Sequence, residues 1–233
     1  MMEKAGYPIK AKIRVVVDPK LPFMGYTVPR GDGFAIVVSG AAVESGLVEG
    51  LLVHEMGHVY RISTGHPSHS AAVIDDVVGP FVRRGMNKDY QQKILHDLVN
   101  HIEDLYADDI SFRVFEGSDV FKMDVGSEFF QSWLTPEPVN TGDVQRDMWL
   151  NTSIMLRNSF ALSNMTRHNI PDTGSKAQAM NRKFLSRMGP GASAQFEYFY
   201  RLMVNLKEEV DEKEYRRLLT EYLGRFVELA DGS

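Results

Sequence analysis

The most constraining feature of the sequence is the segment Leu51–Ile62, which reads LLVHEMGHVYRI. It contains the pattern H-E-x-x-H, formed by His54, Glu55 and His58. Because residues four apart lie on one face of a helix, the two histidines point the same way and can bind one metal ion. Glu55 is rotated by about 100° from His54, so its carboxylate lies beside such an ion. A carboxylate in that place is suited to accept a proton from water that the metal activates.

Apolar residues surround this pattern on several sides, which predicts a helix that is buried around most of its circumference. Burying two imidazoles and a carboxylate is costly unless they are ligated or paired. The alternative is a core helix whose histidines bond to each other and to the backbone. Gly57 has two interpretations: it lets a neighbouring backbone approach, or it relieves crowding beneath the metal. His66 and His69 follow the helix and are expected at the rim of the site.

Composition narrows the class of protein. The chain has 233 residues, a formal net charge of −5 and no cysteine. The negative charge argues against a nucleic-acid partner, and the lack of thiols excludes disulfides, thiolate zinc sites and cysteine catalysis. No apolar run approaches the roughly 18 residues of a membrane span, and the N-terminus lacks the apolar stretch of a signal peptide. We therefore expect a cytoplasmic protein with no membrane partner.

The pattern of residues predicts an α+β fold that is mostly helical, with a small N-terminal sheet. Strands are expected at Lys12–Asp18 and Phe34–Ser39, with an irregular loop between them. One helix is expected from Ala41 to Ser63, with Gly46 as the place where it would break, and short helices are expected within Ala71–Arg84. We predict a core over residues 1–134 and a C-terminal helical part over residues 135–233, packed on the core.

A second informative stretch follows the motif by several dozen residues. Between residues 89 and 112, apolar residues recur at helical spacing and predict one long amphipathic helix. Its opposite side carries a stripe of Asp97, His101, Asp104 and Asp108. Such a stripe is either a solvated outer face or part of a metal site, and the density of histidine and carboxylate favours the second interpretation.

Together these two stretches resemble the gluzincins, the thermolysin-like zinc metallopeptidases, and the size of the chain is similar to that of the compact minigluzincins. The resemblance covers roughly residues 34–112. It implies a zincin-like core, a Zn²⁺ cofactor and a peptide or protein substrate. It also implies that the strand before the motif helix borders the cleft and pairs with an extended peptide.

The resemblance also implies a ligand set. Gluzincins have an acidic third ligand, followed four residues later by an Asp that orients a ligating His. This spacing is met by Asp104 and Asp108, and Glu103 is the alternative third ligand. The family uses Glu as the ligand, so an Asp here requires the helix to lie about one bond closer. Gluzincins often use a distant His or Tyr to stabilise the tetrahedral oxyanion, and His168, at the end of a predicted helix that begins after Asp143, or a tyrosine is the candidate here.

The favoured function is therefore a zinc-dependent peptidase in which Glu55 is the general base. One alternative is a non-catalytic, metal-stabilised scaffold that binds partners. Another is a metal-dependent phosphohydrolase of the HD type. In that case the pair His96-Asp97 would act with an upstream histidine and with Asp143 or Asp147, and the H-E-x-x-H pattern would stay unexplained.

Overall fold

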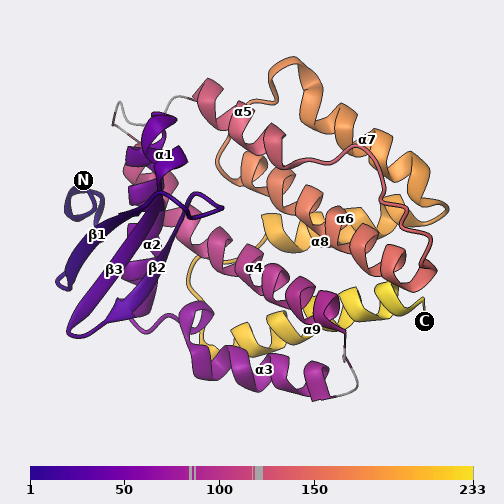
Figure 1. Cartoon of the computed structure of the whole chain (residues 1–233), viewed down its shortest axis with the longest axis horizontal. Helices are drawn as coiled ribbons and strands as arrows, with labels where there is room; N and C mark the ends of the chain where they lie inside the picture. Colours follow the sequence, from indigo (N-terminus) through magenta and orange to yellow (C-terminus); the bar gives the residue numbers. More distant parts are fainter. Residues whose placement is uncertain (84–85, 87, 117, 119–122, 233) are drawn as a thin grey trace. The chain divides into compact units, whose positions relative to one another are not determined.

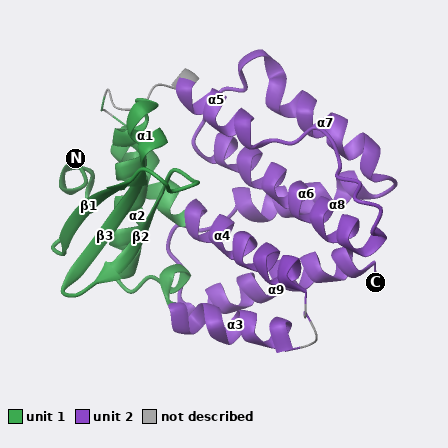
Figure 2. Ribbon diagram, viewed as in Figure 1, with its two compact units in different colours: residues 1–70, 106–122 green, residues 71–105, 123–233 purple. Residues whose placement is uncertain are grey.

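The computed structural model describes the chain except residues 84–85, 87, 117, 119–122 and 233 (Figure 1). It confirms a mostly helical α+β fold with a three-stranded sheet. The described chain forms two compact units, residues 1–70 with 106–122 and residues 71–105 with 123–233 (Figure 2). The predicted division between residues 134 and 135 is not one of these boundaries, and it stays a prediction.

The described residues form three strands followed by α-helices. The strands are β1 (Lys12–Asp18), β2 (Gly25–Arg30) and β3 (Gly33–Ser39). The α-helices are α1 (Gly40–Glu44), α2 (Val48–Ser63), α3 (Ala71–Arg83), α4 (Asp89–Phe115), α5 (Met123–Trp133), α6 (Val144–Arg167), α7 (Lys176–Met188), α8 (Ala192–Val204) and α9 (Glu212–Asp231). Short 3₁₀ turns are η1 (Glu3–Ala5), η2 (Pro67–His69) and η3 (Thr173–Ser175). Among the described residues, none of these helices is long and apolar enough to cross a bilayer.

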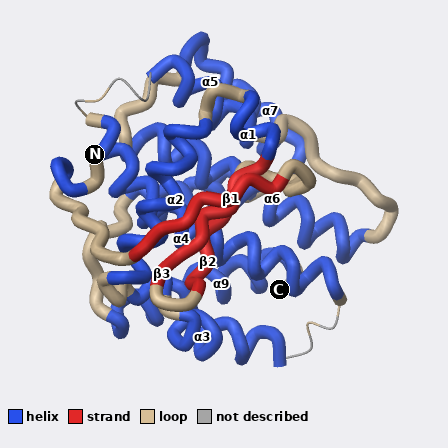
Figure 3. The backbone as a smooth tube through the Cα atoms, turned by 60° about the vertical axis from the view of Figure 1, so that its left-hand side comes forward, coloured by secondary structure: helices blue, strands red, loops and turns tan. Residues whose placement is uncertain are grey.

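The sheet has the order β1-β3-β2, with β3 parallel to β1 and antiparallel to β2 (Figure 3). The predicted loop between the two expected strands was wrong over Gly25–Arg30, which is strand β2. Its glycine and its proline are typical loop residues, but an edge strand tolerates Pro29. The expectation that the strand before the motif helix pairs with an extended peptide was also wrong. That strand, β3, is paired on both sides, and the edge strands are β1 and β2.

Two helix predictions have different outcomes. The expected helix from Ala41 to Ser63 does break at Gly46, whose φ of 73° separates α1 from α2. The expected short helices in Ala71–Arg84 were wrong, because α3 is one helix with Pro80 inside it. Proline removes one backbone hydrogen bond, and packing against α9 within the same unit offsets that loss.

Helix α2 is enclosed by apolar side chains, as its sequence predicted. Val59 packs with Ile36 and Val38 of the central strand β3. Val53 packs with Ile110 and Val114 of α4. The motif therefore sits on a helix whose position is fixed by two apolar clusters on different sides.

The second unit is organised around α6, which packs against α5, α7, α8 and α9. Asp143 caps this helix by accepting a hydrogen bond from the Arg146 amide at 3.1 Å, as predicted. The segment before α6 is held along the helix by amide side chains. Asn151 bonds both the N–H and the C=O of Val139, and Asn158 does the same for Thr135.

The polar stripe of α4 is solvated only in part, because His101 and Asp108 are buried whereas Asp97 is exposed. His101 stacks on Phe160 of α6, with ring centroids 5.0 Å apart and planes at 17°. Burial lowers the pKa of His101 to about 4; Asp104 opposes this shift and Arg157 adds to it. The imidazole is therefore neutral in the folded protein at physiological pH.

This burial predicts acid sensitivity. The unfolded chain binds a proton at His101 near pH 6.5 and the folded chain near pH 4, so the unfolded state holds more protons between these values. The free energy of unfolding should fall as the pH drops through this window, by an amount on the order of 3 kcal/mol. Urea denaturation between pH 4 and 7 should show this fall in the free energy of unfolding in the native chain and not in His101→Phe. His96 on the same helix is exposed, so His96→Phe is the control and should keep the pH dependence. If His96→Phe removed the pH dependence as fully as His101→Phe, the dependence could not be assigned to His101.

Candidate metal centre

The two motif histidines converge on one point, as their spacing predicted. Their Nε2 atoms lie 3.1 Å apart, and their rings are nearly perpendicular at 82°. Two nitrogen ligands about 2.0–2.1 Å from a tetrahedral zinc ion are roughly 3.3 Å apart. The separation of His54 and His58 therefore fits two ligands of a single ion.

The other nitrogen of His54 is held by α4. Its Nδ1 lies 2.8 Å from Oδ1 of the buried Asp108. An ionised carboxylate can only accept a hydrogen bond, so in a neutral His54 ring Nδ1 carries the hydrogen and Nε2 keeps its lone pair. This is the contact expected of an outer carboxylate that orients a metal-binding histidine. The role of Asp108 in metal binding stays a prediction.

Asp104 lies one turn before Asp108 on the unbroken helix α4, so both carboxylates lie on one face of that helix. One ligand atom from each of His54, His58 and Asp104 lies within 4.8 Å of the other two. Glu103 is not part of this group. Burial, with the charge of Asp104, raises the pKa of Glu103 to about 8, so its carboxyl group is largely protonated near pH 7. The choice of Asp104 over Glu103 as third ligand stays a prediction.

Glu55 is held from the sheet side of α2. Its side chain is only 4% exposed, and Thr27 of β2 donates a hydrogen bond from Oγ1 to Oε2 at 2.7 Å. Gly25, also on β2, lies near the other oxygen: a Cβ there would be 3.6 Å from Oε1, but only 2.8 Å from the carbonyl oxygen of Val37. Sequence reasoning missed Thr27 because it missed β2. The adjacent β-branched residues Thr27 and Val28 were the available signal.

Helices α2 and α4 approach each other closely at Gly57. A Cβ on Gly57 would lie 2.8 Å from the carbonyl oxygen of Ala107 and 3.3 Å from its Cα. One turn further along α2, the buried Arg61 donates from Nε to the carbonyl oxygen of Tyr106 at 3.2 Å. The interpretation of Gly57 as a site of close backbone approach is confirmed. The short distance between the helices also suits aspartate side chains, which are shorter than glutamate.

The remaining candidates lie elsewhere. His168 ends α6, and its amide N–H bonds the carbonyl of Asn164 at 3.0 Å; its oxyanion role stays a prediction. His96 and Asp97 are exposed, and the metal-capable group found among the described residues does not include them. The phosphohydrolase alternative therefore stays a prediction that no observation favours.

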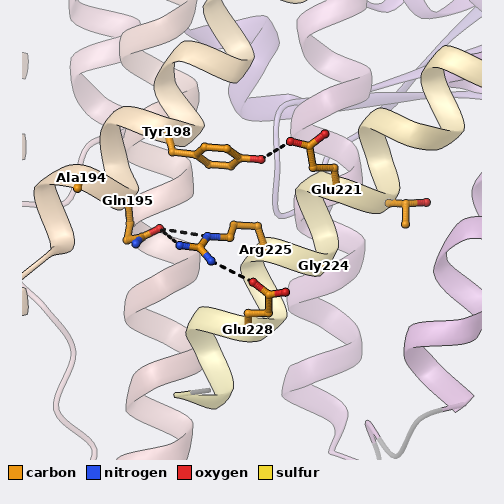
Figure 4. Close-up of a pocket in the computed structure, with 8 residues that line it drawn as sticks. Ala194, Gln195, Tyr198, Glu221, Gly224, Arg225 and Glu228 are labelled. Atoms are coloured by element: carbon orange, nitrogen blue, oxygen red, sulfur yellow. Dashed lines mark hydrogen bonds and ion pairs between the residues drawn. The ribbon is translucent and has the colours of Figure 1, made fainter.

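A surface pocket of about 570 Å³ lies between α8 and α9 (Figure 4). Its polar side chains bond one another. Tyr198 donates to Glu221 at 2.6 Å, and Arg225 donates to both Gln195 and Glu228. Burial, followed by the bond to Glu221, raises the pKa of Tyr198 to about 12, so the phenol keeps its proton. This pocket is lined by paired surface charges and by none of the histidines of the motif.

Comparison with known protein families gives one match, to a family of unknown function that covers residues 6–228. The chain belongs to this family, DUF5781. Comparisons with curated proteins and with solved structures give no match. Because DUF5781 carries no assigned activity, the function of its members has to be argued from the site.

The close contact at Gly57 predicts that this position does not accept a side chain. Gly57→Ala should lower the free energy of unfolding by about 1–3 kcal/mol, because the new methyl meets backbone and the helices must separate. Gly50 on the same helix is the matched control. Its Cβ would meet only a ring carbon of Phe115 at 3.9 Å, so Gly50→Ala should be neutral or stabilising through helix propensity. Equal denaturation midpoints for the two variants would contradict this account.

Proposed function

We propose that this protein is a zinc-dependent peptidase whose metal is held by His54, His58 and an acidic residue of α4. The observation that carries the proposal is the pair of Nε2 atoms 3.1 Å apart. The outer nitrogen of each ring is already engaged, His54 with Asp108 and His58 with His69. If both rings carry their hydrogen on Nδ1, the two Nε2 lone pairs face each other at this distance and repel unless a cation lies between them. Two imidazoles and one carboxylate are the donor set of catalytic zinc sites.

The number of ligands favours an enzyme over a structural zinc site. Structural sites close the tetrahedron with four protein ligands, whereas catalytic sites have three and leave one position open. The group found among the described residues has three members. This supports the peptidase over the non-catalytic scaffold.

Glu55 is the residue that we assign to proton transfer. When bound, zinc supplies the Lewis acidity that acidifies water and polarises a carbonyl group. The Glu55 carboxylate accepts the proton and later delivers it to the leaving amine. Thr27 holds Oε2, so Oε1 is the oxygen left for the proton. Burial of Glu55 and its bond to Thr27 fix the carboxylate before substrate arrives.

The substrate is proposed to bind along β2. This strand is an edge of the sheet, and it carries Thr27, which contacts Glu55. An extended peptide can add to such an edge through main-chain hydrogen bonds. Strand β3 cannot serve in this way, because both of its sides are already paired.

The proposal predicts that Glu55→Gln separates metal binding from hydrolysis. The amide has the shape of the carboxylate but cannot take a proton, so zinc content should stay near one per chain while hydrolysis falls about 10²-fold or more. Unfolded protein substrate is incubated in H₂¹⁸O, and mass spectrometry detects each new carboxyl terminus by its ¹⁸O label. His58→Ala is the companion variant and should lose both zinc and activity.

Two outcomes would overturn parts of this proposal. Unchanged hydrolysis by Glu55→Gln would remove Glu55 as the base. Stoichiometric zinc with no cleavage by the native chain would favour the scaffold alternative.

A further inference from the structure

The turn that follows α2 returns the chain to His58. The turn begins with Gly65, whose φ of 70° is in the left-handed region, and continues into η2. A hydrogen bond within the turn stabilises it: the ring of His66 accepts from the amide of Ser68 at 3.3 Å. His66 is buried and Ser68 is 0% exposed. His69, the last residue of η2, is therefore presented to α2 by a buried, bonded turn.

Three short contacts run from the motif into this turn. Nδ1 of His58 lies 2.7 Å from Nε2 of His69. Nδ1 of His69 lies 2.7 Å from Oγ of Ser68, and that Oγ lies 2.7 Å from Nδ1 of His66. These four residues form one row of hydrogen bonds, which we call the histidine row.

The direction in which the hydrogen bonds of the histidine row are donated follows from the contact at His66, the end of the row farthest from His58. A backbone N–H can only donate, so the Ser68 amide requires Nδ1 of His66 to be an acceptor. The Ser68 hydroxyl therefore donates to His66, and its oxygen accepts from Nδ1–H of His69. A neutral His69 protonated on Nδ1 has a bare Nε2, which accepts from Nδ1–H of His58. The Nε2 of His58 is then left with its lone pair, as a metal ligand requires.

We infer that His69 is a positioning residue that fixes the orientation and tautomer of His58 for metal binding, and that the turn Gly65–His69 exists to hold it there. This inference rests on the proposed function, because it assigns a use to the bare Nε2 of His58. His69 would do for His58 what Asp108 does for His54. A neutral acceptor on this side also avoids adding another negative charge to a site that already contains Asp104 and Asp108.

Zinc affinity tests the inference, with a competing fluorescent chelator as the readout. His69→Leu removes the acceptor and should weaken zinc binding by about 10–100-fold. His69→Gln offers an amide oxygen to Nδ1–H of His58 and should weaken it by less than about tenfold. His96→Leu makes the same substitution at an exposed histidine and should leave the affinity unchanged. Zinc affinity in His69→Leu equal to that of the native chain would overturn the inference.

Ring ¹⁵N chemical shifts at pH 8 test the tautomer directly. His69 should be neutral and protonated on Nδ1, in both the metal-free and the zinc-loaded protein. A ring protonated on Nε2 instead would overturn the inference.

If His69→Leu fails to fold, as judged by its circular dichroism, His69→Gln and the ¹⁵N shifts of the native chain decide the question. If the native chain binds no zinc, the proposed function fails, and the His69 tautomer in the metal-free protein still supports or overturns the fixed direction of the row.

Discussion

The site depends on one packing contact, the approach of α2 to α4 at Gly57 and Ala107. With no side chain between them, the two backbones come close enough for short aspartates to reach the motif histidines. The bond between His54 and Asp108 lies beside this contact, and the buried Arg61 bonds the backbone of Tyr106 on its other side. Interiors are close-packed, so one added methyl group here would move both bonds.

Three elements around α2 each form a hydrogen bond to one side chain of the motif. Helix α4 holds His54, the turn η2 holds His58, and strand β2 holds Glu55. Each motif side chain thus has one polar atom engaged by a neighbouring element. The cost of burying these groups is met by hydrogen bonds from outside the helix. This arrangement explains why a buried helix can carry three polar residues in five positions.

The sequence was most informative where the periodicity was strong and local. The buried motif helix, its break at Gly46 and the long helix with Asp108 were all predictable from spacing alone. Strand β2 was not predictable in this way, because glycine and proline are typical of loops and both occur within it. For that reason Thr27 was missed. His69 was expected only at a rim, since spacing along the chain does not reveal that a turn brings it back to His58.

Zinc K-edge X-ray absorption of the loaded protein tests the central claim most directly. The claim is that the two converging imidazoles are ligands of one ion. It predicts a first shell of nitrogen and oxygen at about 2.0–2.1 Å, with outer-shell scattering from two imidazole rings. A zinc shell made only of oxygen, with no imidazole scattering in the native chain, would contradict the account.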